Sequence, residues 1–266
     1  MAARPIIALM TDFGLRDPFV GIMKGVILGI NPSATIVDVC HELDPGDIRS
    51  ASLVLATAFP YFPAGTVFAA VVDPSVGTRR RAVAAEADDR LVVCPDNGIL
   101  SWVLHNHSLR AAVELSRSEF FLFEVSNTFH GRDVFAPAAA HLSTGVSLEE
   151  FGPRVDDLAA FPIPQALAED ESIEGEVVYV DRFGNLVTNI AHNQLESWRN
   201  KSAGGRIRIQ IGSMEIQGIS ATYGDAPPGH AVAVFGSAGF LEIAVNGGSA
   251  AQLLGAAIGS RVLVYR

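Results

Sequence analysis

Three arginines follow an aspartate in the segment DPSVGTRRR, residues 73–81. Asp73 ends an apolar run, and the Pro-Ser-Val-Gly sequence after it predicts a turn that returns Arg80 to within reach of the carboxylate. A carboxylate can orient a water molecule, and a neighbouring guanidinium can stabilise hydroxide. Spacing alone leaves a second interpretation open, in which all three arginines form a solvated charge run behind a turn.

A histidine precedes a glycine in the segment NTFHGRDVFAPAAAHLS, residues 127–143. Gly131 permits an unusual backbone angle, and the small residues after it predict the start of a helix. A lone histidine in this position is usually structural. Beside Asp73 and Arg80, however, His130 could fix or relay a proton, so the three side chains form one candidate catalytic set.

The segment HELDPGD, residues 41–47, gathers four acidic or imidazole side chains. Its spacing is not that of HExxH, and Pro45 and Gly46 force a turn. We expect Asp47 to cap a helix that begins at Ile48, because its carboxylate can accept from unpaired backbone N–H groups. A metal site in this segment is the less favoured alternative.

Short apolar runs alternate with helical patterns from residue 5 to about residue 145, which is typical of βαβ units and a mainly parallel sheet. Ligands of such proteins bind at the carboxyl ends of the strands. Four polar residues end the apolar runs: Asp12, His41, Asp73 and Asp96. We therefore expect a site at this edge of the sheet.

The sequence pattern changes after a stretch rich in proline, alanine and acidic residues. RIRIQIG, HAVAVFG and FLEIAV alternate with a period of two around glycine-containing turns, which predicts an antiparallel barrel or sandwich. We predict an α/β N-terminal domain with a mainly parallel sheet over residues 1–152 and a linker over 153–172. A small antiparallel β-barrel C-terminal domain is expected over 173–266.

Composition narrows the class of protein. The 266 residues are 49% hydrophobic and carry a formal net charge of −10, which favours a soluble globular protein and argues against nucleic-acid binding. The first apolar segment is broken by Thr11 and Asp12 and is too short for a membrane span or a signal peptide, so we expect a cytoplasmic location. Cys40 and Cys94 lack CxxC spacing and are expected to be buried, inert thiols.

Six segments in order resemble the S-adenosyl-L-methionine (SAM) hydroxide adenosyltransferases, adenosine-forming SAM hydrolases related to the fluorinases and chlorinases. They are TDFG with Asp17 shortly after it, DPSVGTRRR, PDNGIL, FHGRDVFAPAAA, DRFGNLVTNI and GSAGFLEIAVNGGSA. The resemblance implies hydrolysis of SAM to adenosine and L-methionine by attack of water or hydroxide on C5', without a metal or cofactor. It also implies a homotrimer with active sites between the N-terminal domain of one subunit and the C-terminal domain of its neighbour.

The resemblance further implies roles for single residues. The catalytic set falls on Asp73, Arg80 and His130, with Arg79 and Arg81 solvated or structural. Asp12 matches a carboxylate that binds both ribose hydroxyls, a pairing of two donors with an acceptor-only group. The other implied substrate contacts are Asp17 and Asp181 near the methionine ammonium, Asn185 at the adenine edge, Ser237 at the methionine end, and Phe129 and Tyr223 as walls for ribose or adenine.

Two other functions remain as alternatives. Halogenating relatives carry a tyrosine in place of Asp73, and a carboxylate beside the attacking position would repel a halide. Gly131 does not separate a hydrolase from a chlorinase, since a small residue suits either, but it lacks the hydroxyl that the fluorinase offers to fluoride. The second alternative is a non-catalytic protein that binds SAM or adenosine, which would have no need of Asp73, Arg80 and His130 together.

The C-terminal segment departs from the fluorinase pattern. Ala238 and Val245 stand where the fluorinase has arginines. Backbone N–H groups of residues 236–239 are therefore the candidate partners of the methionine carboxylate.

Overall fold

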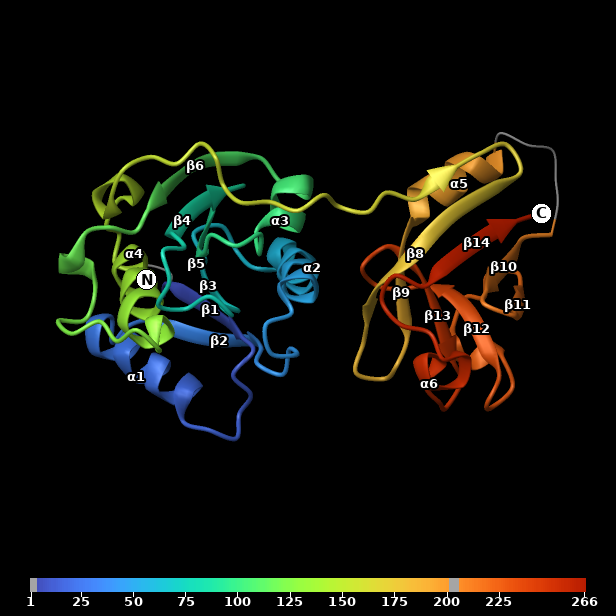
Figure 1. The fold of residues 1–266 in the computed structure, drawn as a ribbon, viewed down its shortest axis with the longest axis horizontal. Helices are drawn as coiled ribbons and strands as arrows, with labels where there is room; N and C mark the ends of the chain where they lie inside the picture. Colours follow the sequence, from blue (N-terminus) through green and yellow to red (C-terminus); the bar gives the residue numbers. More distant parts are fainter. Residues whose placement is uncertain (1–3, 201–205) are drawn as a thin grey trace. The chain divides into compact units, whose positions relative to one another are not determined.

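The chain divides into two compact units in the computed structural model (Figure 1), Met1–Ile163 and Pro164–Arg266. The structure describes residues 4–200 and 206–266. No helix within these two ranges has the length and apolar character needed to cross a membrane.

The first unit is built on a six-stranded sheet with the order β2-β1-β3-β5-β4-β6. Its strands are β1 (Ile6–Thr11), β2 (Thr35–Cys40), β3 (Val67–Val71), β4 (Ala82–Ala87), β5 (Arg90–Pro95) and β6 (Leu109–Glu114). The neighbours β2, β1, β3 and β5 run parallel, whereas β4 is antiparallel to both β5 and β6. The predicted α/β domain with a mainly parallel sheet is confirmed.

Helices cover both faces of this sheet, as Figure 1 shows: α1 (Phe19–Ile30) and α4 (Ala136–Ser143) lie on one side, and α2 (Ile48–Ala58) and α3 (Ser101–Asn106) on the other. Ile7 and Leu9 of β1 share a buried core with Met23 and Ile27 of α1. A strand covered on both faces must be apolar along its length, which explains the continuous run IIALMT of β1. Asp47 caps α2 as predicted, because its Oδ1 accepts from the Ser50 N–H at 3.0 Å.

The second unit is an antiparallel sheet with the order β11-β10-β14-β8-β9-β13-β12. Its elements are β7 (Leu167–Ala168), β8 (Ser172–Val180), β9 (Leu186–Ala191), α5 (His192–Asn200), β10 (Arg208–Ile211), β11 (Met214–Gln217), a short helix (Tyr223–Asp225), β12 (Ala231–Phe235), β13 (Phe240–Val245), α6 (Ala250–Leu254) and β14 (Arg261–Tyr265). The end strands β11 and β12 are in contact, so the sheet nearly closes into the predicted barrel. Ile209 and Ile211 of β10 are buried between exposed neighbours, in keeping with the period of two.

The stretch proposed as a linker, residues 153–172, contains segments with different contacts. Asp157 and Ala159 hydrogen bond to the first unit, through Arg81 and Asp96 respectively. Leu167 and Ala168 form β7, which pairs with β8 in the second unit. The division between the two units falls between these segments.

Candidate active site

The carboxyl ends of β1, β2, β3 and β5 reach the same edge of the sheet, because these strands are parallel. Asp12 directly follows β1, and His41 follows β2. Asp73 follows β3 after one further residue, and Asp96 follows β5. The four polar residues singled out by their position after apolar runs thus belong to one edge, where α/β proteins bind ligands.

A tight turn over residues 73–81 returns the chain from β3 to β4. Gly77 in this turn has a φ of +76°, and a Cβ atom there would lie only 2.2 Å from the carbonyl oxygen of Asn127. Only glycine fits this position, since the backbone is left-handed and the neighbouring backbone is too close for a side chain. The close approach holds the segment that carries His130 against the turn that carries Asp73.

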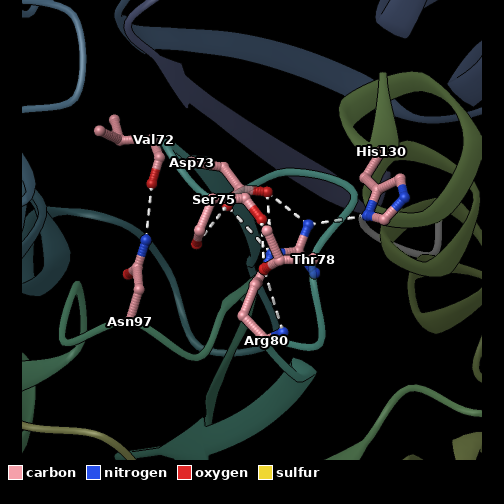
Figure 2. Close-up of polar contacts among 7 residues, drawn as sticks. All are labelled: Val72, Asp73, Ser75, Thr78, Arg80, Asn97 and His130. Carbon is pink, nitrogen blue, oxygen red and sulfur yellow. Dashed lines mark hydrogen bonds and ion pairs between the residues drawn. The ribbon is translucent and has the colours of Figure 1, made fainter. Parts of the chain in front are cut away.

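Arg80 joins the other two members of the candidate catalytic set (Figure 2). Its Nε donates to both carboxylate oxygens of Asp73 at 3.0 Å, and its Nη2 also contacts Oδ2. Nη2 further lies 2.8 Å from Nδ1 of His130. The side chains of Arg80 and Asp73 are only 9% and 5% exposed, and the guanidinium packs over the Phe135 ring. The structure therefore brings Asp73, Arg80 and His130 into one hydrogen-bonded set.

His130 is held in its neutral form within this set. Burial lowers the pKa of the imidazole, and the charge of Arg80 lowers it further, against the opposing effect of Asp73 and Asp133. Since a guanidinium can only donate, Nδ1 of His130 must accept the hydrogen bond from Arg80. The ring proton of the neutral imidazole is then on Nε2, which faces away from Arg80.

Gly131 does not use the unusual backbone angle that a glycine permits, because its φ is not positive. It begins a π-helical turn, Gly131–Phe135, directly after His130. A Cβ at Gly131 would lie 3.2 Å from atoms of Met23, Phe129 and Phe13, closer than side chains usually approach. Tight packing therefore accounts for the glycine. π-helical turns are rare and often occur at functional sites.

The other two arginines of DPSVGTRRR have different surroundings. Arg79 is exposed. Arg81 pairs with Asp96 at 2.6 Å and with Asp157 at 2.7 Å. Asn97, from the PDNGIL segment, donates through Nδ2 to the carbonyl oxygen of Val72 at 2.8 Å and so holds the residue before Asp73 (Figure 2).

Three predicted substrate contacts lie in the first unit. The Asp12 carboxylate accepts from the Gly46 N–H through Oδ2 at 2.7 Å, which leaves acceptor capacity on Oδ1. Asp17 is exposed in the loop before α1. Phe129 packs its ring edge-on against Phe19, with 5.2 Å between ring centroids.

Two predicted substrate contacts form a compact turn in the second unit. Asp181 accepts through Oδ1 from the backbone N–H groups of Phe183 and Asn185, at 2.9 and 2.8 Å. Its Oδ2 accepts from the side-chain amide of Asn185 at 2.9 Å. The carbonyl oxygen of the buried Asn185 amide is left to accept a further donor.

A carboxylate that the sequence did not single out lies beside Tyr223. The phenol of Tyr223 donates to Oε2 of Glu242 at 2.7 Å, and this contact raises the pKa of Tyr223 to about 12. Burial raises the pKa of Glu242, and the charge of Asp181 also raises it. Ser237 is exposed in the turn between β12 and β13. The only sequence signal for Glu242 is an acidic residue within the otherwise apolar strand FLEIAV.

Both cysteines are free thiols. Cys94 is buried, and burial raises the pKa of its thiol, as expected for an inert cysteine. Cys40 is only partly buried. Within residues 4–200 and 206–266, no three His, Cys, Asp or Glu side chains are grouped in a way that could hold a metal ion.

Comparison with known proteins gives matches over nearly the whole chain. Family models for the N-terminal and C-terminal domains of SAM hydroxide adenosyltransferase match residues 7–152 and 175–263. A protein of Salinispora tropica named (R)-S-adenosyl-L-methionine hydrolase is 42% identical over 99% of both chains. A Nocardia brasiliensis protein named fluorinase is 33% identical over 93% of this chain and 92% of its own. The crystal structure of an uncharacterized conserved protein from Thermotoga maritima covers 98% of this chain and 100% of its own, with a TM-score of 0.91 at 40% identity.

Proposed function

The chain belongs to the SAM hydroxide adenosyltransferase family, and from this membership we propose that it hydrolyses SAM to adenosine and L-methionine. The observation that carries the proposal is the hydrogen-bonded set of Asp73, Arg80 and His130 at the carboxyl edge of the sheet. The relative at 42% identity that is named a hydrolase supports it, and the relative named fluorinase is more distant.

The reaction is a displacement at carbon. Water attacks C5' of SAM on the side opposite the sulfonium, a C5'–O bond forms, and the C5'–S bond breaks. The bonding pair leaves with sulfur as the neutral thioether of methionine, and the water loses one proton to solvent. Because the sulfonium is a good leaving group, the protein needs no acid on that side; it must align the three reacting atoms and exclude bulk water.

The catalytic set supplies the nucleophile in this proposal. Asp73 orients the water, and the guanidinium of Arg80 stabilises hydroxide character on its oxygen. His130 accepts from Arg80 and fixes the position of the guanidinium. Asp73 and Arg80 act as one unit, because the guanidinium donates to both carboxylate oxygens.

The remaining residues bind substrate. Asp12 accepts from the two ribose hydroxyls, and Asn185 accepts from the adenine edge through its free carbonyl oxygen. Phe129 and Tyr223 provide walls for ribose or adenine. Asp17 and Asp181 place negative charge near the methionine ammonium, and Ser237 binds the methionine end.

We also propose a cytoplasmic homotrimer without a cofactor. Its active sites would combine the N-terminal domain of one subunit with the C-terminal domain of its neighbour. The trimer, its shared active sites and the lack of a cofactor rest on the family resemblance.

A halogenase is the rival reaction. Asp73 argues against it, since its carboxylate is only 5% exposed and would repel a halide at the attacking position. Gly131 argues against the fluorinase alone, because it lacks a hydroxyl, and neighbouring side chains would have to shift to admit even a Cβ there.

The test is to incubate the purified protein with SAM in halide-free buffer, then with added chloride or fluoride, and to separate the nucleosides. Adenosine and methionine in every buffer, also after dialysis against a chelator, support the hydrolase. A 5'-halogenated nucleoside would establish the rival.

The name of the relative specifies an (R) form of SAM. The configuration of the amino acid is already given by L and that of the ribose by the adenosyl group, so (R) describes the sulfonium sulfur. We therefore propose the (R) form as substrate and would assay both sulfonium epimers separately.

A further inference from the structure

Among the described residues, Glu242 is a buried carboxyl group with no cationic side chain paired to it. It lies on β13 and is 8% exposed. The groups that influence its charge are the Tyr223 phenol and the Asp181 carboxylate, one neutral and one of the same sign. Burying a carboxylate is costly unless a donor or a cation offsets the lost hydration. The site is therefore preorganised for a positively charged group.

One oxygen of Glu242 is available to such a group. Oε2 accepts from Tyr223, whereas Oε1 accepts no hydrogen bond from any residue that the structure describes. Within the same residues, two buried side-chain polar atoms are sealed from solvent and make no hydrogen bond: His41 Nε2, which lies 3.1 Å from the Asp38 carboxylate, and Thr66 Oγ1. Oε1 of Glu242 also lacks a partner but is not among them, so it must be reachable from solvent.

The turn between β12 and β13 is shaped around this carboxyl group. A Cβ at Gly236 would lie 1.7 Å from Oε1 of Glu242, so the glycine leaves the space that the carboxyl group occupies. The N–H groups of Gly236 and Gly239 donate within the turn, each at 3.0 Å. Among the backbone bonds of the described residues, none uses the N–H of Ser237 or Ala238. One acceptor, Oε1 of Glu242, and two free donors, the N–H groups of Ser237 and Ala238, thus lie at one turn.

We propose that Oε1 of Glu242 binds the α-ammonium group of SAM, an inference that rests on the proposed function. An ammonium has three N–H donors and a full charge, whereas the sulfonium has no N–H to offer. Asp181 adds negative charge nearby, but its oxygens already accept three hydrogen bonds within their own turn. The free N–H groups of Ser237 and Ala238 suit the carboxylate of the same amino-acid end, in place of an arginine.

The test pairs one variant with one altered substrate. Glu242→Gln keeps the shape of the side chain but removes its charge. The altered substrate is S-adenosyl-4-(methylthio)butanoate, which is SAM with hydrogen in place of the ammonium. We expect the variant to lose about 10- to 100-fold in kcat/KM on SAM, the range for a charge-assisted hydrogen bond. On the deaminated substrate its kcat/KM should stay within about 2-fold of the unaltered protein's.

Equal losses on both substrates, or no loss on SAM, would overturn the proposal, since a purely structural role does not depend on the ammonium. Glu174→Gln is the matched control, because it removes an exposed carboxylate of the same unit that pairs with Arg261; it should change neither value. If Glu242→Gln does not fold, Glu242→Asp keeps the charge but withdraws it by one methylene and should show the same selective loss.

Failure of the proposed function would be seen separately, as absence of adenosine from the unaltered protein. The same comparison is then made by calorimetry, as the affinities of both proteins for SAM and for the deaminated compound. A loss of affinity confined to SAM supports the ammonium contact, and an equal loss or none overturns it.

Discussion

Arg80 holds two partners with a single planar group. Its Nε donates to Asp73, and its Nη2 lies within hydrogen-bond distance of both Asp73 and His130. Lysine has one compact ammonium and could not reproduce this geometry. With the ring of Phe135 against the guanidinium, the charge is fixed in position before any substrate arrives. Catalysis by positioning requires this kind of fixed charge.

Replacing Asp73 tests the role of the carboxylate directly. We predict that Asp73→Asn lowers kcat by about 100- to 10,000-fold, the usual contribution of a positioned acid or base. Adenosine affinity, measured by calorimetry, should change little, because the ribose and adenine contacts are elsewhere. Asp157→Asn is the matched control: Asp157 pairs with Arg81 but is 83% exposed, and exposed pairs contribute little. Normal turnover by Asp73→Asn would refute the assigned role.

The pH dependence of kcat/KM should follow the protonation of the His130 imidazole. Burial and Arg80 place the pKa of its imidazole below the ordinary value of 6.5. A protonated imidazole cannot accept from Arg80, so kcat/KM should fall as pH drops through this lowered pKa and stay level from there to neutrality. His130→Gln keeps an acceptor but does not titrate in this range, so its pH profile should lack that acid limb. An unchanged limb in the variant would assign the titration to another group.

At the scale of elements, the packing of two loops places the catalytic set. Gly77→Ala adds a Cβ 2.2 Å from the Asn127 carbonyl oxygen at a φ of +76°. Gly65→Ala is the matched control, since its φ is +80° and nothing lies within 4 Å of the added atom. Backbone strain should cost each variant about 1–2 kcal/mol of unfolding free energy, and the clash with Asn127 should cost Gly77→Ala more than this, as measured by denaturant titration. Only Gly77→Ala should also lose activity, by about 10- to 100-fold, because His130 is displaced; equal activities would refute this.

The sequence predicts those features that depend on residues close together in the chain, such as strand ends, helix caps and turns. Strand-ending residues such as Asp12 and Asp73 indicate the functional edge, because parallel strands end together. Asp47 is recognisable as a helix cap from its neighbours alone. The turn after Asp73 predicts that Arg80 returns, since proline and glycine fix its geometry. These features need no knowledge of the rest of the chain.

Features that depend on distant contacts are not predictable in this way. A period of two places Glu242 opposite Leu241 and Ile243, facing solvent, but Tyr223 covers it from a separate segment. In the sequence, Gly131 suggests an unusual backbone angle, but the close packing of Met23 is the physical reason for a glycine at this position. In both cases the decisive neighbour is far away in the sequence.

At the scale of the whole molecule, the proposed residues fall in two units. Asp73, Arg80 and His130 belong to the first unit, and Asp181 and Glu242 to the second. Each unit folds around its own core. A substrate that needs both sets of residues requires the two units to meet, either within one chain or, as in the proposed trimer, between neighbouring subunits.

Mixing two defective variants tests this assembly. Asp73→Asn removes a group of the first unit, and Asp181→Ala one of the second. If neighbouring subunits share each site, co-expressed chains will form some sites from two unaltered units, and activity will exceed that of either variant alone. Sites within one chain would always carry a defect, so the mixture would show only the average. Asp73→Asn mixed with His130→Gln is the control, because both defects lie in the same unit and cannot complement. Light scattering should give the mass of three chains.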